Sequence, residues 1–174
     1  MYDAAVFDFD GVLTRPTPDA VLDEAARESL RAVGVDPTPR AVSHARSSDI
    51  GRVRRLCAAH GLDPDAFVET RDAYTAAAQA AALRDGRKPT YDDVGALAEF
   101  AARGRTVAIV SNNQQELIDR FVAREAPADV AVAYGRGVTS TRCERDPETS
   151  KPTVIGRVSL DDASYVHSFA LTDE

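Results

Sequence analysis

The sequence predicts an α/β fold, with a parallel sheet that has helices on both faces and is interrupted by a large helical insertion. Apolar runs beginning at Val6, Thr106 and Val130 have the length of buried strands. Amphipathic helical patterns alternate with these runs, and such alternation favours a parallel sheet. About a hundred residues separate the first two runs. A strand, helix and strand need only about 30 residues, so the remainder is an insertion.

The first strand ends in two acidic residues one position apart, in Val6-Phe7-Asp8-Phe9-Asp10-Gly11. Side chains alternate along a strand, so Asp8 and Asp10 should lie on the same side where the chain leaves the sheet. This arrangement suits phosphoryl transfer, with Asp8 as the nucleophile and Asp10 as the general acid and base. The alternative is an ordinary Asp-Gly turn, in which both carboxylates only cap the loop.

The second strand, Thr106 to Val110, ends in the polar residues Ser111, Asn112 and Asn113. A helical pattern follows, and the free N–H groups at a helix N-terminus favour anions. Ser111 is therefore a candidate phosphate-binding hydroxyl. The alternative is that the three residues cap the helix, with Glu116 completing a box-like pattern from Asn113. Both interpretations can hold together.

Lysine is rare in this chain, since only Lys88 and Lys151 of its 21 basic residues are not arginine. A lysine among so many arginines indicates a site that needs a compact ammonium group. Lys151, in Ser150-Lys151-Pro152, could balance the charge of Asp8 and of a bound phosphate. The tripeptide Lys-Pro-Thr occurs at both positions, so at least one copy is expected to be a surface turn.

The insertion contains three amphipathic patterns that predict helices ending near Gly34, Gly61 and Gly86. A further helix is expected from Val94 to Ala101, before the second strand. Polar residues near the segment between the first two inserted helices could contact a substrate, although arginines on a helix usually form its solvated face. These residues are Arg46, Ser47, Ser48, Arg52, Arg54 and Arg55.

Composition restricts the function classes. The net charge of −7 and the pI near 5.0 argue against general binding to nucleic acids or anionic membranes. No apolar segment approaches the ~20 residues of a membrane span, and the start shows no signal-peptide pattern. Cys57 and Cys143 have neither metal-ligand spacing nor a disulfide framework. We expect a cytoplasmic monomer or homodimer with a small-molecule partner.

Taken together, Asp8-x-Asp10-Gly11, Ser111-Asn112 and Lys151-Pro152 resemble the first three motifs of the haloacid dehalogenase-like (HAD) hydrolase superfamily. The resemblance implies a Rossmann-like core of residues 1–14 and 89–174, with a helical cap of residues 15–88. It implies that Asp8 and Asp10 are catalytic and hold Mg²⁺, and that Ser111, Asn112 and Lys151 bind the substrate. Because dehalogenases lack the second aspartate, Asp10 favours a phosphatase or a phosphomutase.

The fourth motif of that superfamily, a strand ending in Gly-Asp, is not found. The apolar run Ser164 to Leu171 resembles the strand, but His167 and Ser168 occupy the expected Gly-Asp positions. Val154, Ile155 and Val158 before it allow two helical turns at most, and residues for a final strand and helix are absent. The remaining nearby carboxylates are Asp161, Asp162 and Asp173.

Three hypotheses follow. The first is a Mg²⁺-dependent phosphatase that hydrolyses a small phosphorylated metabolite through an aspartyl-phosphate on Asp8. The second is a catalytically impaired HAD-like protein that binds a ligand or a partner. The third is a truncated product with an unpaired sheet edge.

Overall fold

The computed structural model describes residues 4–124, 130–136, 140–145 and 152–158. The chain divides into two compact units. We call Met1–Phe9 together with Asp92–Glu174 the sheet unit, and Asp10–Tyr91 the helical unit. The chain enters and leaves the helical unit once each, so this unit is an insertion into the sequence of the other.

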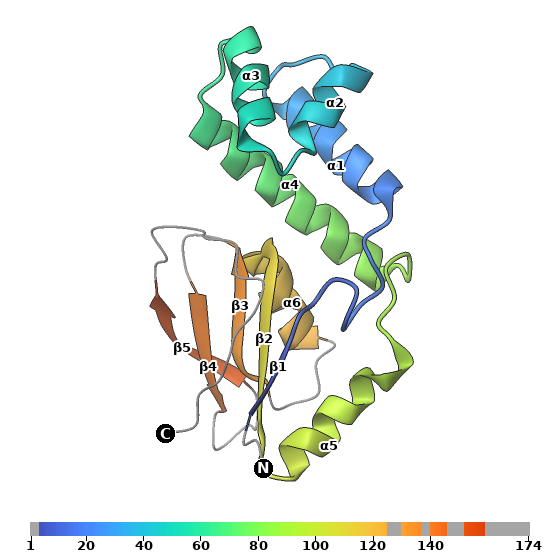
Figure 1. Cartoon of the computed structure of the whole chain (residues 1–174), viewed down its shortest axis with the longest axis vertical. Coiled ribbons are helices and arrows are strands. Elements are labelled where there is room, and N and C mark those ends of the chain that lie inside the picture. The colour runs from blue at the N-terminus through green and yellow to red at the C-terminus, as the bar shows by residue number, and fades with distance from the viewer. Residues whose placement is uncertain (1–3, 125–129, 137–139, 146–151, 159–174) are drawn as a thin grey trace. The chain divides into compact units, whose positions relative to one another are not determined.

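The sheet unit contains a five-stranded sheet in the order β1-β2-β3-β4-β5 (Figure 1). Strands β1 (Ala4–Phe7), β2 (Thr106–Gln114) and β3 (Val130–Arg136) are parallel, which confirms the predicted parallel arrangement. Strands β4 (Ser140–Arg145) and β5 (Pro152–Val158) continue the sheet in antiparallel pairing.

The prediction of helical turns near residues 154–158 is wrong, because this segment is strand β5. Its sequence, Pro-Thr-Val-Ile-Gly-Arg-Val, is rich in β-branched residues, which pack well on a pleated sheet. Pro152 is the first residue of the strand, where a missing N–H is tolerated. The run Ser164 to Leu171 and the acids Asp161, Asp162 and Asp173 lie outside the described residues.

Two helices of the sheet unit precede and follow β2. A short 3₁₀ helix, η1 (Asp92–Gly95), leads into α5 (Ala96–Ala102), and α6 (Gln115–Arg124) connects β2 to β3. The apolar stripe of α6 is buried, as its spacing predicts, and Phe121 makes an edge-on contact with Phe9 at 4.9 Å between ring centroids. This contact anchors the segment immediately after Asp8.

The helical unit contains α1 (Asp19–Ala32), α2 (Pro39–Ala45), α3 (Ile50–His60) and α4 (Pro64–Arg84). Three of these helices were expected from their periodicity, whereas α2 was not. The prolines at 37 and 39 indicate a helix end, but Pro39 is the first residue of α2, where proline is well tolerated. Thr38 caps this helix by accepting a hydrogen bond from the Ala41 N–H at 3.2 Å.

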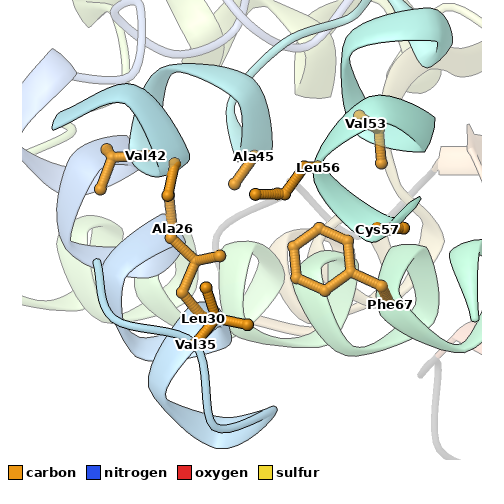
Figure 2. Packing of buried hydrophobic residues seen from close by; sticks show 10 residues of the cluster. Ala26, Leu30, Val35, Val42, Ala45, Val53, Leu56, Cys57 and Phe67 are labelled. Atoms are coloured by element: carbon orange, nitrogen blue, oxygen red, sulfur yellow. The ribbon is translucent and has the colours of Figure 1, made fainter. Parts of the chain in front are cut away.

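The core of the helical unit is formed by small aliphatic side chains around one aromatic ring (Figure 2). Phe67 from α4 is 1% exposed and lies among Leu30, Val53, Leu56 and Cys57. Each helix contributes to this cluster, so the unit has a hydrophobic core of its own. Among the described helices, none combines the length and apolar character that crossing a membrane would require.

Candidate active site

Asp8 directly follows strand β1, and Ser111 lies in the second half of its parallel partner β2. Strand β1 pairs with β2 in a register that places Phe7 opposite Ile109. Asp8 directly follows Phe7, and Ser111 comes two residues after Ile109. Both residues therefore lie toward the carboxyl edge of this strand pair, which is where ligands bind in open parallel sheets.

The Asp8 carboxylate is exposed and accepts a hydrogen bond at 2.6 Å from the N–H of Phe9. No ion pair involves Asp8 within the part of the chain that the structure describes. Phe9 itself is fully buried, so the backbone that carries Asp8 is anchored from its next residue. An exposed carboxylate on a fixed backbone is suited to react with a substrate.

Ser111 is half-buried, and its hydroxyl oxygen accepts two hydrogen bonds from Asn113, from N–H at 3.3 Å and from Nδ2 at 3.2 Å. These bonds occupy both lone pairs of the hydroxyl. Its proton has no acceptor among the described residues, so it can be donated to an incoming anion. Asn112, between the two residues, is exposed.

Strand β2 continues to Gln114, and α6 begins only at Gln115. The expectation that the helix starts directly after an Asn113 cap is therefore wrong by one residue, and the side-chain amide of Asn113 supports Ser111 instead. The polar residues that follow the apolar run extend the strand, because β2 and β3 still pair between Gln114 and Arg136.

Two hydrogen bonds that the sequence does not predict fix the chain just beyond Ser111. Gln115 accepts a hydrogen bond from the Gly135 N–H at 2.6 Å, and its Nε2 donates to the Ala133 carbonyl at 3.2 Å. Gly135 approaches so closely that a Cβ there would lie 2.6 Å from the Cα of Gln115 and 2.9 Å from the carbonyl oxygen of Asn113. Glycine is therefore required at this position.

Asp10 belongs to the helical unit and is bound there by three hydrogen bonds. Its Oδ1 accepts from the Lys88 ammonium and from the Thr17 N–H, the latter at 3.1 Å, and its Oδ2 accepts from the Thr17 hydroxyl at 3.1 Å. The side chain of Asp10 is 33% exposed, whereas that of Lys88 is completely buried. The ammonium also donates to the Thr17 hydroxyl at 2.8 Å and to the Arg15 carbonyl at 3.1 Å.

The Thr17 hydroxyl is the centre of this network. It lies 2.7 Å from the side-chain oxygen of Gln79, a residue that is only 2% exposed. A hydroxyl has one proton, so it can donate either to Asp10 or to Gln79. Thr17 therefore donates to only one of these two acceptors at a time, while it accepts from Lys88.

Lys88 is therefore not the surface copy of the Lys-Pro-Thr tripeptide. Burial lowers the pKa of its ammonium, and the hydrogen bond and charge of Asp10 act in the opposite direction. The rarity of lysine in the sequence was the available signal for this residue. Thr17 and Gln79 had none, because neither belongs to a recognisable pattern.

Two connecting segments of the helical unit pair with one another beside this network. The Arg15 N–H donates to the Pro89 carbonyl at 2.9 Å, and the Tyr91 N–H donates to the Leu13 carbonyl at 3.1 Å. The guanidinium of Arg15 lies over the Tyr91 ring, 4.5 Å from its centroid. These contacts fix the backbone just before Thr17 and just after Lys88.

A second feature of the helical unit is a cavity of about 400 Å³ lined mostly by polar side chains of α1, α2, α3 and the segment between α2 and α3. Arg46 is one of the arginines proposed to contact substrate, and it lines this cavity. Its guanidinium donates to Asp19 and Asp23, each at 2.5 Å. The charge of Arg46 is thus largely compensated by carboxylates of its own unit.

The remaining predicted residue, Lys151, lies outside the described residues. Within the described ranges, no three side chains of His, Cys, Asp or Glu gather in a way that could hold a metal ion. Asp8 belongs to the sheet unit and Asp10 to the helical unit, so each carboxylate is described within its own unit.

Solved structures with a similar fold include CbbY from Rhodobacter sphaeroides in complex with phosphate, at 19% identity and a TM-score of 0.51. The match covers 78% of this chain and 64% of that one. A mutant of CbbY in complex with xylulose-(1,5)bisphosphate matches at 18% identity and a TM-score of 0.50, with the same coverage. A predicted phosphoglycolate phosphatase from Haemophilus somnus matches at 18% identity and a TM-score of 0.49, covering 77% and 62% of the two chains.

This chain thus spans less than two thirds of the length of these neighbours. No protein of curated function matches it. The likeness to the solved structures, at such low identity, concerns the α/β Rossmann-like fold. The family model described as haloacid dehalogenase-like hydrolase matches residues 2–150, and with it the resemblance carried by Asp8, Asp10 and Ser111 is confirmed. The chain belongs to the haloacid dehalogenase-like hydrolase family.

Proposed function

We propose that this protein is a Mg²⁺-dependent phosphatase that hydrolyses a small phosphorylated metabolite through an aspartyl-phosphate on Asp8. The observation that carries the proposal is the register of β1 and β2, which places an exposed carboxylate and a serine hydroxyl at one edge of the sheet. The hydroxyl can donate to a phosphate oxygen while the carboxylate attacks phosphorus. The family, a hydrolase family, supports the same reaction class.

The reaction has two steps. In the first, a carboxylate oxygen of Asp8 forms a bond to phosphorus, the bond to the leaving oxygen breaks, and Asp10 gives that oxygen a proton. In the second, Asp10 takes a proton from a water molecule as the water oxygen bonds to phosphorus and the bond to Asp8 breaks. Inorganic phosphate leaves, and both aspartates return to their starting forms.

Mg²⁺ suits the donor set, because it prefers oxygen ligands and usually binds one or two carboxylates together with water and phosphate oxygens. We propose that Asp8 and Asp10 hold the ion. When bound, it would offset the mutual repulsion of carboxylates and phosphate. Lys151 and the polar pair Ser111-Asn112 are the proposed phosphate-binding residues.

The proposed substrate class rests on the chemistry of the candidate residues and on the ligands of the similar solved structures. CbbY has been solved with phosphate and with a sugar bisphosphate, which supports a phosphorylated metabolite of similar size. Phosphoglycolate and sugar phosphates are therefore the first compounds to assay. A fold alone does not determine the substrate, so a panel is needed.

The decisive experiment measures phosphate release from p-nitrophenyl phosphate with Mg²⁺ and with excess chelator. We expect turnover that requires Mg²⁺ and that Asp8→Asn abolishes. Asp93→Asn is the matched control, since Asp93 is an exposed aspartate of the same unit and should leave turnover unchanged. Undiminished turnover in Asp8→Asn would rule out the aspartyl-phosphate mechanism. Absence of turnover in the unaltered protein, with retained binding of phosphate by calorimetry, would favour a binding module.

A further inference from the structure

Lys88 is a buried cation whose hydrogen-bonding capacity is fully used. Its side chain is 0% exposed, and its ammonium donates to the Asp10 carboxylate, the Thr17 hydroxyl and the Arg15 carbonyl. An ammonium has three protons, so each of these acceptors can receive one. A buried charge is tolerated only when it is paired and hydrogen-bonded in this way.

The same network acts on Asp10. Both carboxylate oxygens of Asp10 face donors, namely the ammonium of Lys88 and the N–H and hydroxyl of Thr17. Because these three groups surround both carboxylate oxygens, the network fixes one orientation of the Asp10 side chain.

We propose that Lys88 is a positioning residue that, together with Thr17, holds the Asp10 side chain in one orientation for the hydrolysis of the aspartyl-phosphate. In that step Asp10 must accept a proton from water while the water oxygen bonds to phosphorus and the bond to Asp8 breaks. The inference rests on the proposed function, because it assigns Lys88 to one of the two steps of that reaction. It predicts that loss of Lys88 slows the second step more than the first.

A purely structural role for Lys88 makes a different prediction. Its bond to the Arg15 carbonyl also ties together the paired connecting segments, so its loss could simply loosen the helical unit. Loosening would reduce both steps or reduce the amount of folded enzyme. The ratio of the two steps separates the alternatives.

The test uses the full chain with Mg²⁺ and p-nitrophenyl phosphate in a stopped-flow experiment. p-Nitrophenolate leaves readily without a proton, so the burst amplitude reports formation of the aspartyl-phosphate and the later linear rate reports its hydrolysis. For Lys88→Met we expect a retained burst and a linear rate that falls about tenfold or more, a part of the 10²–10⁴-fold that general base catalysis contributes. Acid-quenched samples should contain more aspartyl-phosphate than the unaltered enzyme does.

Val53→Ala is the control for lost stability, because Val53 is fully buried in the core of the helical unit and lies outside the network. It should leave the ratio of burst to linear rate unchanged. Thr17→Val and Thr17→Ser form a second pair, since only serine keeps the hydroxyl that bridges Asp10 and Lys88. We expect the valine variant to behave like Lys88→Met and the serine variant to restore the linear rate.

The outcomes separate the two proposals. If the unaltered enzyme forms no aspartyl-phosphate, the proposed function fails and the role of Lys88 fails with it. If the enzyme forms it, and Lys88→Met and Thr17→Val either match the unaltered enzyme or lose both steps equally, the positioning role alone is overturned. If Lys88→Met does not fold, the two Thr17 variants decide the question in the same assay.

Discussion

Replacing Asp10 with asparagine should destabilise the protein, because it removes the countercharge of a buried ammonium. Lys88 is completely buried, and Thr17, Arg15 and the new amide oxygen are all neutral acceptors. Breaking a buried ion pair by removing one partner typically costs about 3–5 kcal/mol. Lys88 can limit the cost by losing its proton, and an ordinary lysine titrates near pH ~10.4. Removing the proton from such a lysine costs about 1.36 kcal/mol for each pH unit below its pKa. Deprotonation of Lys88 therefore limits the destabilisation to about 4.6 kcal/mol at pH 7.

The pH dependence has a definite sign. Burial lowers the pKa of Lys88 in the folded protein, so the unfolded chain binds more protons and stability rises with pH in that window. Asparagine at position 10 removes the hydrogen bond and the negative charge of Asp10, both of which raise the pKa of Lys88. The range in which stability rises with pH therefore begins at a lower pH in this variant. The difference in the free energy of unfolding between Asp10→Asn and the unaltered protein should therefore fall below about 2 kcal/mol at pH 9.

The assay is urea unfolding followed by far-ultraviolet circular dichroism at pH 7 and pH 9. Asp23→Asn is the matched control, because Asp23 pairs with Arg46 at the surface with 41% of its side chain exposed. A pair of this kind contributes about 0–1 kcal/mol. The double variant Asp10→Asn with Lys88→Met should regain much of the lost stability. A loss at pH 7 no larger than that of the control, or one that does not change with pH, would refute the reasoning.

Two further predictions concern packing. Gly135→Ala should cost about 1–3 kcal/mol, because the added Cβ meets the backbone of Gln115 and Asn113 rather than a flexible side chain; urea unfolding measures it, and an unchanged midpoint would contradict the close approach. Phe67→Ala should cost about 3–5 kcal/mol through the cavity it leaves in the helical unit. Phe100→Ala, at a side chain that is 37% exposed, should cost less, and equal losses would argue against Phe67 as the centre of the core.

Most of the fold could be predicted because its elements are marked locally. The apolar runs of β1, β2 and β3 and the stripes of α1, α3, α4 and α6 are periodic, and periodicity is the strongest signal in a single sequence. Helix α2 was missed because its seven residues are too short for a clear stripe and begin at Pro39. Strand β5 was missed because a short apolar run fits either a strand or a helix until its partner β4 is known.

The sequence suggests candidate site residues only near the ends of its apolar runs. Asp8, Asp10 and Ser111 stand out because strand ends are where a parallel sheet gathers ligands. The network around Asp10 could not be found in this way, since its other members Thr17, Gln79 and Lys88 are 7, 69 and 78 residues from Asp10 in the sequence. Their meeting depends on how α4 returns to the first connecting segment, and pairing at such separation leaves no local pattern.

The hydrogen bonds between Leu13 and Tyr91 and between Arg15 and Pro89 bring the two ends of the helical unit together. A segment whose ends already meet can be grafted into a loop of another protein without stretching the host, and the entropy needed to close such a loop grows only slowly with its length. Residues 10–91 therefore form a segment that could be transplanted as one unit. Because Asp10, Thr17 and Lys88 all lie within this segment, a transplanted module would bring their hydrogen-bond network with it.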